Sequence, residues 1–270
     1  MAFAHRRVQR LRRLSGRASA RSEEACFVAE GAKVIGEALR AGAPIDSVYF
    51  DASSAGPEEL ALLSGCEAAG CQTFELAPGV LARFASTVTP QPVVALVGKV
   101  DVSLPTLLAK RPALVVVCAE VRDPGNAGTV MRSAAAAGAE GVVFCSESVD
   151  PFNPKTVRAS AGALFQIAVV AGGEPGWVLH ELAEGGLTRW GAVARGGEDY
   201  TDVDLGPPFA LVVGNEAHGL PDGLEAGLDG LVSIPMPGGA ESLNVGTATA
   251  VILFEAARQR RHVAAQGAGR

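Results

Sequence analysis

The chain lacks several features that would place it in a common class of protein. Aromatic residues make up 5% of its 270 residues, so stacking of nucleobases on aromatic side chains is not expected as its main mode of binding. No stretch of about 18 consecutive apolar residues occurs, so no membrane-spanning helix is predicted. The five cysteines form no C-x-x-C pair and the four histidines are far apart in sequence, so no structural zinc site is predicted.

Motifs of nucleotide and ester chemistry are missing as well. The glycine-rich segment 123–128 (DPGNAG) does not have the G-x-G-x-x-G spacing of dinucleotide-binding proteins. Neither the G-K-[ST] of a P-loop nor the G-x-S-x-G of a hydrolase occurs. Cys118 and Cys145 lie in apolar runs and are interpreted as free thiols of a protein in a reducing cytoplasm.

Positive charge is concentrated at the start of the chain. The net charge is −6, yet residues 1–21 hold seven arginines and no acidic residue; subtracting that +7 leaves −13 for residues 22–270. This asymmetry predicts a basic N-terminal arm over residues 1–21 that binds a polyanion. A solvated terminus and an organelle transit peptide are the alternatives. The candidate contact residues are Arg6, Arg7, Arg10, Arg12, Arg13 and Arg17.

The rest of the chain is predicted to form two α/β domains. Residues 22–97 alternate short apolar runs with helical patterns, which is typical of a small α/β/α sandwich. A short helix at 80–85 is one of these patterns. Residues 98–111 are predicted to be a linker. Residues 112–270 contain apolar runs without alternation, as expected for parallel strands covered on both faces, and helices are predicted between them, among them one at 154–164.

Polar residues follow three of the predicted buried strands. One group runs from Glu120 to Arg132, a second from Gly214 to Gly219, and a third lies in the loop 235–244. Ligands of open α/β sheets bind beyond the carboxyl ends of strands, so the three groups together predict a site. The helix after the third loop is apolar on nearly all sides up to Glu255, with Val245, Ala248 and Ile252 along one face. It is therefore expected to be covered by its own sheet and by a second subunit.

These segments resemble a known family. Residues 123–132 (DPGNAGTVMR) resemble motif 1 of the SpoU-type RNA ribose 2′-O-methyltransferases, which belong to the SPOUT superfamily. Residues 211–220 (LVVGNEAHGL) resemble motif 2, and residues 234–245 (IPMPGGAESLNV) resemble motif 3. The motifs occur in the family's order and spacing. Residues 22–97 resemble the ribosomal-protein-like substrate-binding domain of the family.

The resemblance implies a fold, an activity and partners. The fold would be α/β: a Rossmann-like parallel sheet with a trefoil knot over residues 112–270, preceded by the small α/β/α domain. The protein would form a homodimer through the knot and transfer a methyl group from S-adenosylmethionine to a ribose 2′-hydroxyl in RNA. Ribosomal RNA is favoured because of the separate N-terminal domain. The same reaction on transfer RNA, or a non-catalytic RNA-binding knot protein, are the alternatives.

The resemblance also implies roles for single residues. Arg132 is expected to hold an RNA phosphate, and Glu216 to accept a proton or to hold the arginine. Asn244 would bind ligand, cap the last helix, or do both. His218 is a weaker candidate for the base. The predicted catalytic residues are Asn126, Arg132, Glu216, Ser242 and Asn244, and the predicted cofactor-binding residues are Ala194, Gly214, Asn215, Ile234, Met236 and Leu243.

Overall fold

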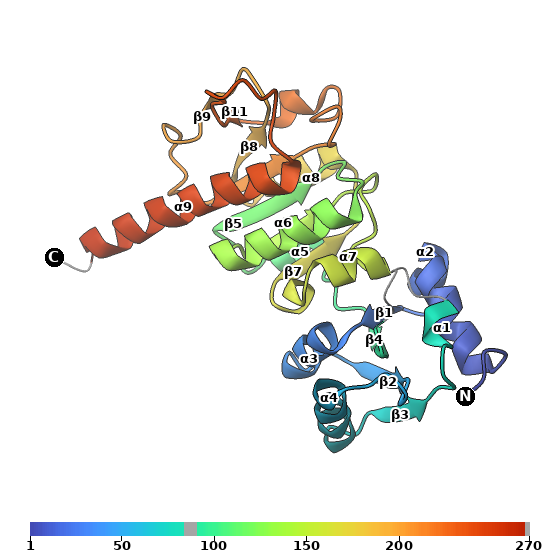
Figure 1. The fold of residues 1–270 in the computed structure, drawn as a ribbon. Coiled ribbons are helices and arrows are strands. Elements are labelled where there is room, and N and C mark those ends of the chain that lie inside the picture. Colours follow the sequence, from blue (N-terminus) through green and yellow to red (C-terminus); the bar gives the residue numbers. More distant parts are fainter. Residues whose placement is uncertain (84–90, 268–270) are drawn as a thin grey trace. The chain divides into compact units, whose positions relative to one another are not determined.

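The computed structural model describes residues 1–83 and 91–267 (Figure 1). The chain divides into two compact units, each described here by itself. Unit 1 comprises Met1–Val100 with Phe152–Gln166, and unit 2 comprises Asp101–Pro151 with Ile167–Arg270. The helix predicted at 80–85 falls partly outside the described residues, and the part inside them is a 3-10 turn, η1 (Leu81–Arg83).

Unit 1 contains a four-stranded sheet with strand order β1-β4-β2-β3. The central strand β4 runs antiparallel to both of its neighbours, and β2 and β3 are parallel. All five residues of β1 are buried, and each strand supplies apolar side chains to the core. The elements are β1 (Cys26–Glu30), α3 (Ala32–Arg40), β2 (Ile45–Phe50), α4 (Pro57–Ala68), β3 (Gln72–Glu75) and β4 (Val93–Gly98).

The arginine-rich N-terminal segment differs from the separate arm expected from its charge. It forms two helices, α1 (Arg6–Gly16) and α2 (Ala18–Glu23). Val8, Leu11 and Leu14 recur every third position between the arginines, lie on one face of α1, and are 0% exposed in the core of unit 1. Residues 1–21 are therefore part of unit 1, because this apolar stripe is buried together with the sheet.

A second difference concerns the segment Phe152–Gln166, which clusters with unit 1 although residues 112–270 were expected to form one domain. The ring of Phe27 on β1 lies 5.0 Å from the ring of Phe152 and 6.2 Å from that of Phe165. The helix predicted at 154–164 is also shorter. It divides into α7 (Pro154–Ala159) and the 3-10 turn η2 (Ala163–Phe165), because Ala161 (φ 50°) and Gly162 (φ 97°) interrupt it.

Unit 2 is built on a seven-stranded, all-parallel sheet with order β7-β6-β5-β10-β8-β11-β9. The strands β5, β6 and β10 are buried along their whole length, as their unbroken apolar sequences require. The strands are β5 (Leu114–Cys118), β6 (Gly141–Phe144), β7 (Ala168–Ala171), β8 (Thr188–Ala192), β9 (Glu198–Asp199), β10 (Phe209–Val213) and β11 (Gly230–Ser233).

Helices cover both faces of this sheet. α5 and α8 (Pro175–Glu184) share a buried core with β5 and β10, while α6 (Pro124–Ala137) and α9 (Val245–Gly267) pack on each other over the other face (Figure 1). α5 (Leu104–Leu108) occupies part of the predicted linker and buries Leu104 and Leu107. None of the described helices is long and apolar enough to cross a membrane.

The strand order brings the three motif segments to one edge of the sheet. The chain runs outward from β5 through β6 to β7 and later returns to insert β10 directly beside β5. The loops after β5 and β10 are therefore neighbours at the carboxyl ends of their strands. The loop after β11 leads from the same edge into α9, which packs against α6. A reversal of this kind is where doubly wound sheets bind ligands.

Candidate active site

A chain of side-chain hydrogen bonds joins the three motif segments. Asn244 Nδ2 donates to Asn126 Oδ1 over 2.7 Å, and Asn126 Nδ2 donates to Glu216 Oε1 over 3.0 Å. Asn244 begins α9, Asn126 lies in the first turn of α6, and Glu216 follows β10. We refer to these three residues as the Asn–Asn–Glu relay. It fixes the relative positions of segments that are about 30 to 120 residues apart in sequence.

Asn244 has two tasks at its end of the relay. Its Oδ1 accepts hydrogen bonds from the backbone N–H groups of Gly246 (2.9 Å) and Thr247 (3.3 Å), which satisfies donors at the start of α9. Its Nδ2 is thereby directed to Asn126. Of the roles considered for Asn244, the helix cap is present. The capping hydrogen bonds orient the side-chain amide of Asn244 so that its Nδ2 contacts Asn126.

Glu216 holds the loop before α6. Its carboxylate accepts from the backbone N–H of Asp123 (3.0 Å) and of Arg122 (3.4 Å) in addition to Asn126. Burial acts to raise the pKa of Glu216, but the hydrogen bonds from Asn126 and the backbone outweigh it and hold the pKa below its usual range. A lowered pKa makes a carboxylate a weaker proton acceptor, and proton acceptance by Glu216 stays a prediction. The contacts make Glu216 a residue that positions the loop.

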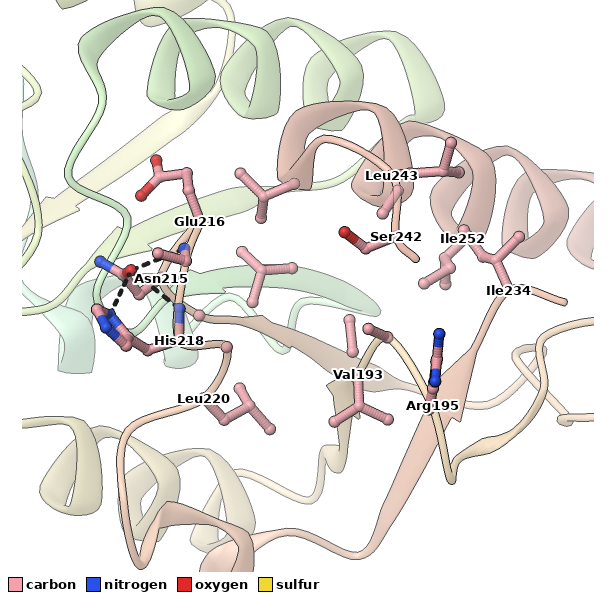
Figure 2. A pocket seen from close by; sticks show the side chains of 18 of the residues that line it. Val193, Arg195, Asn215, Glu216, His218, Leu220, Ile234, Ser242, Leu243 and Ile252 are labelled. Atoms are coloured by element: carbon pink, nitrogen blue, oxygen red, sulfur yellow. Dashed lines mark hydrogen bonds between the residues drawn. The ribbon is translucent and has the colours of Figure 1, made fainter. Parts of the chain in front are cut away.

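A cavity of about 520 Å³ opens beside the relay (Figure 2). It is bounded by the loops that follow β8, β10 and β11 and by the first turns of α9. The side of α9 that carries Val245, Ala248 and Ile252 forms one wall. All six residues predicted to bind a cofactor line this cavity: Ala194, Gly214, Asn215, Ile234, Met236 and Leu243.

The predicted catalytic residues divide into two groups. Glu216 and Ser242 line the cavity. Asn126 and Asn244 are not among the lining residues, and the hydrogen bonds of the relay connect them to Glu216. Arg132 lies on α6, is exposed, and makes no hydrogen bond or ion pair with any residue the structure describes. Its guanidinium is therefore available to a ligand.

The loop after β10 is shaped by its backbone. A Cβ at Gly214 would lie 2.0 Å from the carbonyl oxygen of Gly219, so only glycine permits this close turn. Asn215 N donates to the same oxygen over 2.6 Å. Within the loop, Asn215 Oδ1 accepts from the backbone N–H of Ala217 and His218, and the His218 ring lies against it (Figure 2). Asn215 Nδ2 donates to the carbonyl oxygen of Glu120 over 3.3 Å, so Asn215 also joins this loop to the segment that follows β5.

Several lining residues were not predicted from the sequence. Val193 and Arg195 follow β8, a strand whose end carries no polar motif. Asp222 and Glu225 lie beyond the end of motif 2. Val245, Ala248 and Ile252 are predicted to lie on one apolar face of a helix. Their helical spacing is the sequence feature that could have identified them as lining residues. The lining residues that the sequence did not single out as site residues are Ala192, Val193, Arg195, Val213, Ala217, Gly219, Leu220, Asp222, Glu225, Val245, Ala248 and Ile252, while His218, considered there as a base, also lines the cavity.

The charge of the lining favours a cationic ligand. Three residues with carboxylates (Glu216, Asp222 and Glu225) and one with a guanidinium (Arg195) are among the described residues that line the cavity, together with many apolar residues. A negative balance in a partly enclosed cavity attracts positive charge. No cluster of three or more residues able to hold a metal ion occurs in the described parts of the chain. The residues present suit an organic cation with an apolar portion.

The arginines of the N-terminal helices, in unit 1, are not equivalent. Arg10 pairs with Glu24 (2.6 Å) and Asp46 (3.0 Å), and Arg13 also pairs with Glu24. Arg7 lies 4.2 Å from the ring centroid of Phe74. The other three predicted contact residues, Arg6, Arg12 and Arg17, are exposed and have no ion pair within residues 1–83 and 91–267.

The lowered pKa of Glu216 generates a prediction for stability. A carboxyl whose pKa is lower in the folded than in the unfolded state stabilises the fold above the unfolded pKa of about 4.3, and this contribution is lost as the pH falls through the folded pKa. Glu216→Gln should lower the free energy of unfolding by about 1 kcal/mol at pH 7, a value reduced for the exposure of the side chain. Urea titrations should show the difference from the wild type shrinking below about pH 4.

Glu225→Gln is the matched control, because Glu225 lines the same cavity without a side-chain hydrogen bond to any described residue. It should change the free energy of unfolding by less than about 0.5 kcal/mol at either pH. Equal effects of the two substitutions would contradict the role assigned to Glu216.

Comparison with known proteins places these observations in a family. Residues 113–254 match the model of the SpoU rRNA Methylase family, and residues 5–95 match the MRM3-like substrate binding domain. The chain is 32% identical over 262 residues to a 23S rRNA (uridine(2479)-2′-O)-methyltransferase from Streptomyces viridochromogenes, covering 94% of this chain and 90% of that protein. It is 32% identical over 234 residues to the 23S rRNA (guanosine(2553)-2′-O)-methyltransferase RlmP of Bacillus subtilis, covering 87% and 89%.

Other relatives match a smaller part. The 23S rRNA (guanosine-2′-O-)-methyltransferase RlmB of Xanthomonas axonopodis pv. citri is 43% identical over 148 residues, and the match spans 55% of this chain and 59% of that protein.

Solved structures agree with the sequence matches over almost the whole chain. An AdoMet-bound rRNA methyltransferase from Sinorhizobium meliloti has a TM-score of 0.81 at 32% identity, covering 96% of this chain and 95% of that one. The SpoU methyltransferase AviRb from Streptomyces viridochromogenes, in complex with AdoMet, has a TM-score of 0.82 at 31% identity, covering 96% and 100%. With motifs 1, 2 and 3 joined by the relay and a family model matched over residues 113–254, the chain belongs to the SpoU rRNA methylase family.

Proposed function

We propose that this chain transfers a methyl group from S-adenosylmethionine to a ribose 2′-hydroxyl of ribosomal RNA. The observation that carries the proposal is the Asn–Asn–Glu relay, which brings the three family motifs together beside a 520 Å³ cavity. Relatives aligned over most of the chain are named 23S rRNA 2′-O-methyltransferases, and two similar structures are named as binding AdoMet. Both sets of names favour ribosomal RNA over transfer RNA as the substrate, and an enzyme over a non-catalytic binding protein.

The cavity fits the proposed cofactor. Ile234, Met236 and Leu243 supply apolar walls for an adenine, and Gly214 brings a backbone close to the ligand. The excess of carboxylates over guanidinium groups in the lining suits the positive charge of a sulfonium. S-adenosylmethionine, when bound, supplies an electrophilic methyl group on that sulfonium.

The residues around the cavity are assigned to positioning and charge stabilisation. The ribose oxygen must approach the methyl carbon in line with the bond that breaks, so correct placement alone lowers the barrier by several kcal/mol, up to about 7–11 in ideal cases. Arg132 is assigned to an RNA phosphate, since a guanidinium binds phosphate through two parallel hydrogen bonds and is a very poor base. Ser242 and Asn126 are assigned to the ribose. Glu216 and Asn244 hold the segments that carry these groups.

The proposal extends to finer features of the fold and assembly. We assign a trefoil knot to the C-terminal part of unit 2, supported by the insertion of β10 between β5 and β8. A homodimer formed through this region is supported by apolar side chains left uncovered there, with Phe254 48% and Leu243 37% exposed. Five free cysteines, four of them buried, support a reducing compartment, and the cytoplasm is the proposed location.

The N-terminal helices are proposed as a binding surface for RNA phosphates. Arg12, Arg13 and Arg17 line a hollow of about 510 Å³ together with Gln9 and Gly16. Arg13 is neutralised by Glu24, whereas Arg12 and Arg17 are free of ion pairs with the described residues. Arg12 and Arg17 are therefore expected to contribute more to RNA binding than Arg10 and Arg13, whose charge is already compensated.

Substitution of Arg132 tests the proposed reaction. Arg132→Ala should reduce methyl transfer at least about 100-fold, because a charged group that positions the substrate is lost. It should leave the affinity for S-adenosylmethionine nearly unchanged, since Arg132 does not line the cavity. Incorporation of labelled methyl into RNA and isothermal titration with the cofactor measure the two quantities. Loss of cofactor binding, or retained activity, would overturn the assigned role.

Substitution of surface arginines tests the RNA surface. Deleting residues 1–21 would remove Leu11 and Leu14 from the core, so point substitutions are the cleaner test. The double substitution of Arg12 and Arg17 by Gln should reduce the slope of log Kd against log salt by about 1.5, at roughly 0.7–0.9 per phosphate contact. The matched control replaces Lys33 and Lys110, which are also exposed and make no ion pair with the described residues. An unchanged slope for the first variant, or equal changes for both, would exclude α1 as the RNA surface.

A further inference from the structure

Arg195 is the one cationic arginine or lysine among the residues that line the cavity described above, and the proposed reaction gives it no role. It lies in the short segment between β8 and β9, at the carboxyl end of the sheet. Its side chain makes no hydrogen bond or ion pair with any of the described residues, although Asp222 and Glu225 line the same cavity. A guanidinium left without a partner in a cavity is available to the ligand.

The backbone on either side of Arg195 is fixed to β11. Val193 N donates to Val232 O over 3.0 Å, and Ser233 Oγ donates to Gly197 O over 2.9 Å. A Cβ at Gly197 would lie 2.7 Å from the carbonyl carbon of Val232, so the segment lies directly against that strand. Arg195 is exposed, and it lies in a short loop whose backbone is anchored on both sides.

Arg195 lies toward the apolar end of the cavity. Figure 2 shows Arg195, Ile234 and Ile252 toward one end of the cavity, while Asn215 and His218 lie toward the other end. The proposed function places the adenine against Ile234 and Leu243. The guanidinium of Arg195 thus lies at the end of the cavity where the proposed function places the aromatic base.

We propose that the guanidinium of Arg195 lies against the adenine ring of the cofactor and closes the apolar end of the cavity. The inference rests on the proposed function. A guanidinium is planar and weakly hydrated and stacks on aromatic faces, so it covers a base at a smaller desolvation cost than an ammonium group does. The adenine then lies between the aliphatic wall formed by Ile234 and Ile252 and a cationic plane. Arg195 acts as a binding residue that selects a purine without supplying any group to the reaction.

Calorimetry with two nucleosides tests this contact. S-adenosylhomocysteine keeps both the adenine and the amino-acid portion of the cofactor, whereas 5′-methylthioadenosine keeps the adenine and the sulfur but has no carboxylate. Arg195→Ala should weaken the binding of both compounds by the same factor, about two- to thirty-fold. Arg195→Lys, which keeps the charge and loses the plane, should recover little of the affinity. Arg261→Ala, an exposed arginine on α9, is the control and should change neither Kd.

Other outcomes are equally informative. A loss with S-adenosylhomocysteine and none with 5′-methylthioadenosine would mean that Arg195 binds the carboxylate, and would overturn the inference. Unchanged binding of both compounds would overturn it too. If the wild type bound neither compound, the proposed function itself would fail, whereas wild-type binding together with an unaffected Arg195→Ala variant would refute only the adenine contact.

Discussion

The site depends on the hydrogen bond between Asn244 and Asn126, because that bond closes the relay that ends at Glu216. Each residue of the relay serves its own segment first. Asn244 caps α9, and Glu216 binds the backbone before α6. Their remaining hydrogen-bonding groups then meet at Asn126. The hydrogen bonds that satisfy backbone N–H groups at the starts of α6 and α9 thus also determine how three loops, distant in sequence, are placed. The site is preorganised by these contacts.

The close approach of α6 and α9 makes this relay possible. A Cβ at Gly246 would lie 2.8 Å from the side chain of Thr129, so the absence of a side chain there lets the two helices come together where Asn244 and Asn126 meet. The relay also favours the charged form of Glu216. Glu216 is a carboxylate near neutral pH, the hydrogen bonds that lower its pKa favour this charged form, and it accepts from the backbone N–H group of Asp123 before α6. These contacts support our proposal that the chain contributes to catalysis by positioning, with the positive charge of Arg132 available to the substrate.

Part of the lining of the cavity could be predicted from the sequence. The six expected cofactor residues follow the parallel strands β8, β10 and β11, whose carboxyl ends meet at one edge of the sheet, and all six line the cavity; their role in cofactor binding stays a prediction. Arg195 was missed because the end of β8 carries no motif, and only the pairing of β8 beside β10 and β11 brings it to the cavity. The charge of residues 1–21 obscured the apolar stripe of Val8, Leu11 and Leu14. The placement of Phe152–Gln166 in unit 1 depends on packing against Phe27, a contact between residues far apart in sequence.

The most direct test of the account is to locate the methyl group after reaction. The purified chain is incubated with unmodified ribosomal RNA, transfer RNA and labelled S-adenosylmethionine, and the labelled nucleotides are identified by mass spectrometry. The account predicts label on a ribose 2′-oxygen of ribosomal RNA, at a bond that then resists alkaline cleavage. Label on a base, or on transfer RNA in preference to ribosomal RNA, would contradict it.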